Sequence, residues 1–360
     1  MRWVNVHDLV RKGIIFLVLV MMNCKDPIDL KGEGSIGLLV IDGSINTLPG
    51  PYTLKLGYTV GLTQKPRPAT KAHALLVDDE SGVTEEFIET DSGKYVVPGA
   101  VIQGTPGHRY HIEVVLRDGR SYATKPERVP DATGVDSPYF EVSTTSDFVD
   151  ETEVKVSVVN VYTNAQLPQG EKDYYLRWSA TETYMFEQTP IPNPLTGALP
   201  LPCYVDGIPD GQRITLFSTE GQHRDRLDGL LVASRRIDYS FLGRHYFTVY
   251  QSSMTQEAYN YWKNVNQLIN RNGSIFDTPP APIVGNAFSK TDEEEKVLGF
   301  FEATNTTLSR FYLLKGNIPL ALAPYCLDPR YGIYWPGYPR ECSDCLSLDN
   351  SFHTAPDWWN

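Results

Sequence analysis

The chain has 360 residues, of which 41% are hydrophobic and 21% are charged, and its formal net charge at pH 7 is −12. This length is more than one core usually holds, and the apolar fraction excludes a wholly disordered chain, so we expect two globular domains. The negative charge excludes a non-specific nucleic-acid binder, which would need a basic surface. The chain contains 28 Gly, 26 Pro and 21 Tyr, which favours short strands and turns over long helical bundles.

The first segment, residues 1–23, has the pattern of a secretory signal peptide. Arg11 and Lys12 precede the apolar run 14–22, and Cys24 follows shortly after it. Nine apolar residues in a helix span about 14 Å, which is too short to cross a hydrocarbon core of about 30 Å. No Ala-x-Ala-like cleavage site lies near the end of the run, and the segment instead resembles a bacterial lipoprotein box. We therefore predict that the segment is removed and that Cys24 becomes the lipid-modified first residue.

Charged residues follow Cys24 directly, at Lys25, Asp26 and Asp29. They resemble the export signal that directs Bacteroidota lipoproteins to the outer leaflet of the outer membrane. We therefore predict a lipid-anchored outer-membrane protein that faces the cell exterior, with residues 24–35 as a lipidated tether. A solvated flexible linker without an export role is the alternative interpretation of the same charges.

Residues 36–128 are predicted to form an immunoglobulin-like β-sandwich. Apolar residues alternate with polar ones over 52–58 and again over 110–116, which is the period of a sheet with one solvent-exposed face. Turn residues separate these segments at distances typical of short strands. The pattern Gly93-x-Tyr95 also resembles the immunoglobulin-like and carboxypeptidase-regulatory-like modules that occur beside outer-membrane transporters.

Residues 129–138 contain two prolines and show no periodicity, so we place a linker there. A second β-rich domain is predicted over 139–360. It carries one helix at about 254–271, where apolar residues recur at spacings of three and four after a Ser253-x-x-Gln256 capping pattern. The predicted fold class is therefore mainly β, with an N-terminal immunoglobulin-like β-sandwich followed by a second β-rich domain with one packed α-helix.

Four cysteines follow Cys24, namely Cys203, Cys326, Cys342 and Cys345. An even number of cysteines in an exported chain predicts two disulfides, whose pairing the sequence does not define. A redox dithiol at Cys342-x-x-Cys345 and a zinc site built from all four thiols are the alternatives. The redox motif normally opens a helix in a βαβ unit, whereas here it lies in a proline-rich tail.

No residue pattern indicates catalysis, a cofactor or a metal. The seven histidines show no ligand spacing, and His108 and His111 point to opposite faces if they lie on one strand. Gly32-x-Gly34-x-x-Gly37 matches the glycine spacing of a dinucleotide-binding fingerprint. That fingerprint needs a strand before it and a helix after it, whereas here the motif lies at the end of the predicted tether and precedes a predicted strand. We therefore predict a protein that is not an enzyme and uses no cofactor.

Aromatic residues are concentrated in the C-terminal tail. Tyr334, Trp335 and Tyr338 lie between prolines, and exposed aromatic residues of this kind are typical of sugar- or protein-binding faces. Core packing is the alternative explanation for these three residues. For Trp178, which lies in an apolar strand pattern, we expect burial.

The order of the motifs along the chain provides a further observation. The predicted leader and the sandwich with its Gly-x-Tyr pattern are followed by Gly273-Ser-Ile-Phe-Asp277 and by Cys342-Ser-Asp-Cys345. In this order the features are similar to those of the Bacteroidota lipoproteins of domain-of-unknown-function family 4249, over essentially the whole chain after the leader. The resemblance implies an outer-membrane lipoprotein, commonly encoded beside a TonB-dependent transporter, and it supplies no established reaction or catalytic residue.

Three functions are compatible with these features. We favour a non-catalytic accessory binding subunit of a SusC-like TonB-dependent transporter, because a lipid anchor raises the local concentration at the mouth of the barrel. The second is a structural subunit of a larger outer-membrane assembly or export complex. The third is a surface hydrolase, which no group of residues in the sequence supports.

Overall fold

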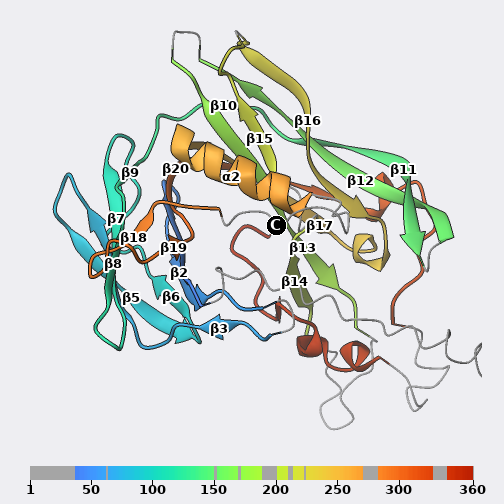
Figure 1. Cartoon of the computed structure of the whole chain (residues 1–360). Helices are drawn as coiled ribbons and strands as arrows, with labels where there is room; N and C mark the ends of the chain where they lie inside the picture. Colours follow the sequence, from blue (N-terminus) through green and yellow to red (C-terminus); the bar gives the residue numbers. More distant parts are fainter. Residues whose placement is uncertain are drawn as a thin grey trace, which may run out of the picture.

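The computed structural model describes residues 37–61, 64–149, 152–168, 172–188, 201–209, 214–222, 224–270, 283–326 and 339–359 (Figure 1). Within these residues the chain is mainly β, as predicted, and it contains a single α-helix. The strands form a large mixed sheet and a smaller four-stranded antiparallel sheet. No helix in this part of the chain combines the length and the apolar character that crossing a membrane requires.

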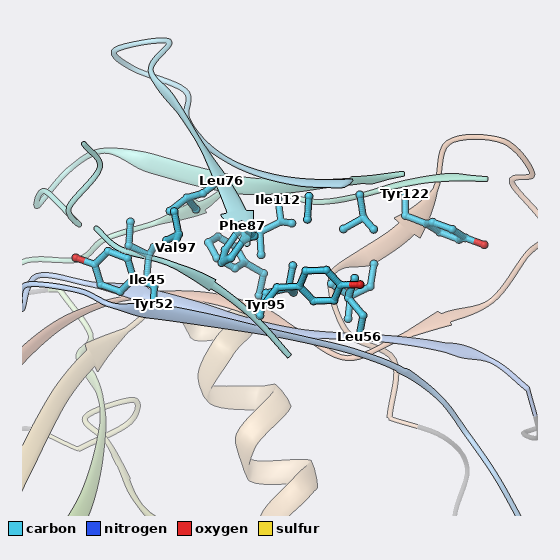
Figure 2. Close-up of a cluster of buried hydrophobic side chains, with 14 of the residues drawn as sticks. Ile45, Tyr52, Leu56, Leu76, Phe87, Tyr95, Val97, Ile112 and Tyr122 are labelled. Atoms are coloured by element: carbon cyan, nitrogen blue, oxygen red, sulfur yellow. The ribbon is translucent and has the colours of Figure 1, made fainter. Parts of the chain in front are cut away.

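The first nine strands form two layers around a shared core. Alternation decides which side chains are buried, since Tyr52, Leu54 and Leu56 are buried and Lys55 between them is exposed. Figure 2 shows side chains from both layers in the space between them, including Leu56 from one layer and Ile112 from the other. The strands are β1 (Leu39–Asn46), β2 (Tyr52–Tyr58), β3 (Arg67–Pro68), β4 (His73–Asp78), β5 (Thr84–Asp91), β6 (Lys94–Val97), β7 (Arg109–Val115), β8 (Ser121–Thr124) and β9 (Glu127–Arg128).

Strands from the other end of the chain complete these layers. β18 (Ala287–Ser289) pairs with β8, whereas β19 (Val297–Leu298) and the first part of β20 (Phe301–Leu313) run parallel to β1. Gly299 makes this approach possible, because its φ is 93° and a Cβ there would lie 2.1 Å from the carbonyl oxygen of Ile41. The division at residues 129–138 stays a prediction, and the regions on either side of it share the large sheet.

The remaining strands form two further layers that face each other. β17 lies between β13 and the second part of β20, and all three are antiparallel. Trp178 and Phe247 from this group pack against Val161 and Val232 of the smaller sheet, and Trp178 is buried as expected. The first group contains β13 (Tyr175–Phe186), β14 (Cys203–Gly207), β15 (Thr215–Ser218), β17 (His245–Met254) and β21 (Ser351–Phe352). The smaller sheet contains β10 (Gly134–Val135), β11 (Tyr139–Val149), β12 (Thr152–Gln166) and β16 (Arg226–Arg236).

The predicted helix corresponds to α2 (Gln256–Ile269). Its N-cap is Thr255, whose Oγ1 accepts a hydrogen bond from the backbone N–H of Ala258 at 3.2 Å. The capping pattern predicted to start at Ser253 is therefore wrong, because Ser253 is still part of β17. Ala258 is fully buried beside Phe300, which anchors the start of the helix on the large sheet.

Two disulfides hold the C-terminal tail, and the prediction that all four cysteines pair in this way is confirmed. Cys203 at the start of β14 is bonded to Cys345, and Cys326 is bonded to Cys342. The first of these bonds joins residues 142 positions apart in the sequence. Short 3-10 helices connect other elements of the described chain: η1 (Tyr239–Phe241), η2 (Lys315–Asn317), η4 (Arg340–Cys342) and η5 (Cys345–Ser347).

Candidate ligand-binding cavity

The outer face of the antiparallel strands carries a row of polar side chains. Thr181 on β13 lies opposite Thr248 on β17, and Thr248 lies opposite Arg310 on β20. Successive side chains on a strand point to opposite faces, and the neighbours Ala180 and Val249 belong to the core. The row therefore points away from the core and places two hydroxyls and a guanidinium side by side across three strands.

The C-terminal tail and this row form an open cavity of about 690 Å³. Two contacts hold the tail in place. Strand β21 pairs with β14, and a disulfide joins Cys203 at the start of β14 to Cys345 in η5. Trp358 packs edge-on against Tyr246, with ring centroids 5.0 Å apart. The described lining combines hydroxyl, amide, charged and apolar groups: Thr181, Thr183, Asp206, Gly207, Ile208, Thr248, Tyr250, Arg310, Asn350, Phe352, Thr354, Ala355, Pro356, Asp357 and Trp358.

Arg310 is the cation of this cavity. Its Cζ lies 3.8 Å from the centroid of the Trp358 ring, and its Nε donates a hydrogen bond to Thr248 Oγ1 at 2.9 Å. No carboxylate among the described residues forms an ion pair with it. Burial lowers the pKa of the Arg310 guanidinium from its ordinary value, because water is displaced without a compensating anion.

Two other arginines with little exposed surface show the usual arrangement. Arg177 Nη2 lies 2.6 Å from Glu302 Oε1, and its guanidinium stacks on Trp262 with Cζ 4.3 Å from the ring centroid. Arg235 Nε lies 2.9 Å from Glu182 Oε2. In both cases the carboxylate neutralises the buried charge and joins two elements of the fold. The cavity arginine differs because the described protein provides it with no such partner.

Two carboxylates also line the cavity. Asp206 Oδ1 accepts a hydrogen bond from Thr183 Oγ1 at 2.6 Å, and Asp357 lies exposed on the tail. Neither carboxylate is paired with a cation of the described chain. The cavity therefore offers donors at Arg310, acceptors at the two aspartates, and threonine hydroxyls that can do both.

An ion-pair network lies on the opposite, core-facing side of β13. Glu182 Oε2 lies 3.0 Å from Nε2 of His245, which is fully buried, and His245 Nδ1 lies 3.3 Å from the carbonyl oxygen of Ser240. Burial alone would raise the pKa of Glu182, but His245 and Arg235 outweigh this effect and lower it. The network joins β13 to β16, η1 and β17, and none of these residues lines the cavity. We therefore assign it a structural role behind the cavity wall.

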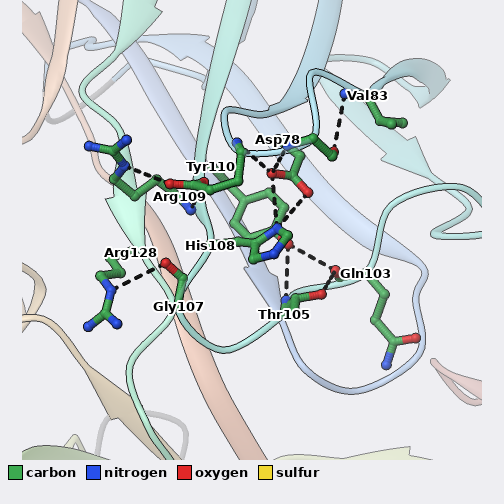
Figure 3. Close-up of polar contacts among 11 residues, drawn as sticks. Asp78, Val83, Gln103, Thr105, Gly107, His108, Arg109, Tyr110 and Arg128 are labelled. Atoms are coloured by element: carbon green, nitrogen blue, oxygen red, sulfur yellow. Dashed lines mark hydrogen bonds and ion pairs between the residues drawn. The ribbon is translucent and has the colours of Figure 1, made fainter.

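Asp78, Glu80 and His108 have the composition of a metal site. Figure 3 shows His108 beside Asp78, and its Nδ1 lies 3.0 Å from Asp78 Oδ2. Glu80 Oε1 accepts a hydrogen bond from Arg109 Nε at 3.0 Å. Burial alone would raise the pKa of Asp78, but hydrogen bonds, among them that with His108, outweigh it and lower the pKa. These internal partners fix the turn between β4 and β5 against the start of β7.

Cys203, Cys345 and His353 form a second group of potential ligands. Both sulfurs belong to a disulfide, so neither is a thiolate that could bind a metal. His353 Nδ1 lies 3.1 Å from the carbonyl oxygen of Pro202, which ties the tail to the residue before β14. We therefore assign this group to the attachment of the tail.

Comparison with known families gives one match. The family described as Domain of unknown function (DUF4249) matches residues 25–310. The chain belongs to this family. The match confirms the resemblance seen in the order of the motifs, and it includes Arg310 but ends before the tail that carries Trp358. No curated protein matches the DUF4249 chain.

Several predicted site residues lie outside the described residues and remain predictions. They are Cys24, Lys25, Asp26 and Asp29 near the start of the chain, and Tyr334, Trp335 and Tyr338 in the tail.

The structure instead brings together a site that the sequence did not single out. Thr181 and Thr183 alternate along one strand, and Arg310 directly precedes the apolar end of another, which is the only signal the sequence offers. That signal becomes specific only when the strand register places Thr181, Thr248 and Arg310 in one row.

Proposed function

We propose that this DUF4249 protein is a surface-exposed, lipid-anchored outer-membrane protein that binds cargo as a non-catalytic accessory subunit of a SusC-like TonB-dependent transporter. The lipid on Cys24 would concentrate the protein at the mouth of the barrel, where even a weak contact persists. The open cavity around Arg310 supports a binding function, because a volume of about 690 Å³ is in the range of small-molecule sites.

The chemistry of the lining supports binding rather than turnover. A hydroxyl becomes a nucleophile when a neighbouring base removes its proton, and the described lining contains neither histidine nor cysteine. Among the carboxylates of the described lining, Asp206 is exposed and accepts a hydrogen bond from the hydroxyl of Thr183. We propose that these hydroxyls orient a ligand and do not attack it.

The N-terminal layers would act as a spacer between the lipid and the cavity. We propose that β1 to β9 form an immunoglobulin-like module, and the two layers packed around Tyr95 and Ile112 support this proposal. β20 belongs to these layers through its first part and to the cavity wall through Arg310. A rigid connection of this kind would hold the cavity at a fixed height above the membrane.

Recovery of the protein with its partners after mild detergent extraction tests this function. We expect a TonB-dependent barrel to be recovered with the wild-type protein, and the protein to be digested when protease is added to intact cells. Recovery of several assembly or export subunits instead would favour a structural role, and shielding from protease would contradict exposure at the cell surface. A Cys24→Ala variant serves as the control that has lost the anchor.

A further inference from the structure

Arg310 has hydrogen-bonding capacity that the described protein does not use. Its Nε is bound to Thr248 and one face of its guanidinium lies on Trp358, but no described acceptor is bound to the two terminal amino groups. A guanidinium offers these groups as a planar fork that matches the two oxygens of a carboxylate. Because an uncompensated charge with restricted access to water is costly, a ligand that neutralises it gains affinity.

The two aspartates place a second requirement on the ligand. Asp206 accepts a hydrogen bond from Thr183, Asp357 lies exposed in the same lining, and neither carboxylate is paired with a described cation. A ligand that carried only negative charge would be repelled by both. The chain as a whole has a net charge of −12, which further disfavours a polyanion.

We propose that the cavity binds a small monocarboxylate that also carries hydrogen-bond donors, with its carboxylate on the fork of Arg310 and its donors directed at Asp206 and Asp357. This inference rests on the proposed binding function and names the class of its ligand. Two kinds of compound combine a carboxylate with hydrogen-bond donors in this way. One is an amino acid or short peptide, whose donor is an ammonium group, and the other is a sugar acid, whose donors are hydroxyls. The apolar side chains of Phe352 and Ile208 in the same cavity would contact the carbon skeleton of either one.

Calorimetric titration of the detergent-solubilised full-length protein tests the proposal with two pairs of probes. Triglycine is compared with triglycine amide, in which a neutral carboxamide replaces the carboxylate, and glucuronate is compared with glucose. We expect the carboxylate member of at least one pair to bind at least tenfold more tightly than its counterpart without a carboxylate. The pair that shows this preference identifies the source of the ligand.

Substitution of the arginine connects the preference to the cavity. Arg310→Gln is expected to abolish the preference, whereas Arg67→Gln should leave it unchanged, because Arg67 stacks on Tyr58 and neither residue lines the cavity. If Arg310→Gln lowers the thermal midpoint so far that binding is not measurable, Arg310→Lys keeps the charge without the fork and should bind at least threefold more weakly than wild type.

Three results would overturn the ligand class: equal affinity within both pairs of probes, no binding of any probe, or a preference that survives Arg310→Gln. Recovery of a TonB-dependent barrel from the same solubilised preparation tests the proposed function separately. A recovered barrel without a carboxylate preference overturns only the ligand class, and a carboxylate preference without a barrel overturns only the transporter partnership.

Discussion

Glu127 is a buried carboxyl group whose protonation we expect to control stability near neutral pH. It lies on β9 and is 5% exposed, and its Oε2 accepts a hydrogen bond from Oγ1 of Thr255, the N-cap of α2, at 2.7 Å. Burial raises the pKa of Glu127 from 4.5 to about 7, although hydrogen bonds from Thr255 and Asn286 act in the opposite direction. The carboxyl that joins the N-terminal layers to the helix is therefore mostly neutral below about pH 7 and mostly ionised above it.

The direction of the pH dependence follows from this raised pKa. A carboxyl whose pKa is higher in the folded state than in the unfolded state stabilises the fold when it is protonated. The stabilisation from Glu127 is complete below pH 4.5 and is lost as the pH rises through about 7. Because each unit of pKa difference is worth about 1.4 kcal/mol, the difference between 4.5 and about 7 corresponds to about 3 kcal/mol.

Glu127→Gln removes this dependence, because glutamine stays neutral at every pH and has nearly the same shape. Urea unfolding at pH 5 and pH 8 should show that the variant gains about 2 to 3 kcal/mol relative to wild type as the pH rises. Glu293→Gln is the matched control, since Glu293 is exposed and its replacement should not alter the pH dependence. Parallel pH dependences for wild type and Glu127→Gln would refute the neutral, buried carboxyl.

Further predictions concern the core, the close backbone approach at Gly299, the tail and the lipid anchor. Trp178→Ala should lower the free energy of unfolding by about 3 to 5 kcal/mol in urea titrations, because it empties the core between the two sheets. Gly299→Ala should lower it by about 3 kcal/mol, because its new Cβ would meet a backbone carbonyl of β1, and an unchanged midpoint would contradict that approach. Replacing Cys203 and Cys345 together by alanine should cost about 4 kcal/mol, since the bond closes a long loop, and should weaken binding in the cavity if the tail is its wall. Cys24→Ala should move the protein from the membrane to the soluble fraction on cell fractionation, and retention in the membrane would count against the lipid anchor.

The strands that alternate cleanly could be predicted from the sequence, because burial of one face leaves a period of two. The strand at 52–58 has the predicted bounds, and helix α2 lies within two residues of the predicted range at either end. The N-cap of the helix could not be predicted, because Ser253 and Thr255 are both suitable N-cap residues. Only the length of β17 decides between them.

The pairing of distant strands could not be predicted. β20 lies parallel to β1 although Phe301 and Gly43 are separated by most of the chain, and no local pattern encodes that partnership. The cavity depends on the same kind of information, since Thr181, Thr248 and Arg310 are unremarkable in their own segments. The disulfide pairing could not be predicted for the same reason. An even number of cysteines indicates two bonds, but it does not show which cysteines are joined.

The structure of the complex purified from native membranes tests the central claim most directly. Electron cryo-microscopy should show the protein on the extracellular face of a TonB-dependent barrel, with acyl chains on Cys24 in the outer leaflet and the Arg310 cavity open towards the barrel. A protein with an unmodified amino terminus, or one whose cavity is closed by assembly subunits, would contradict the account.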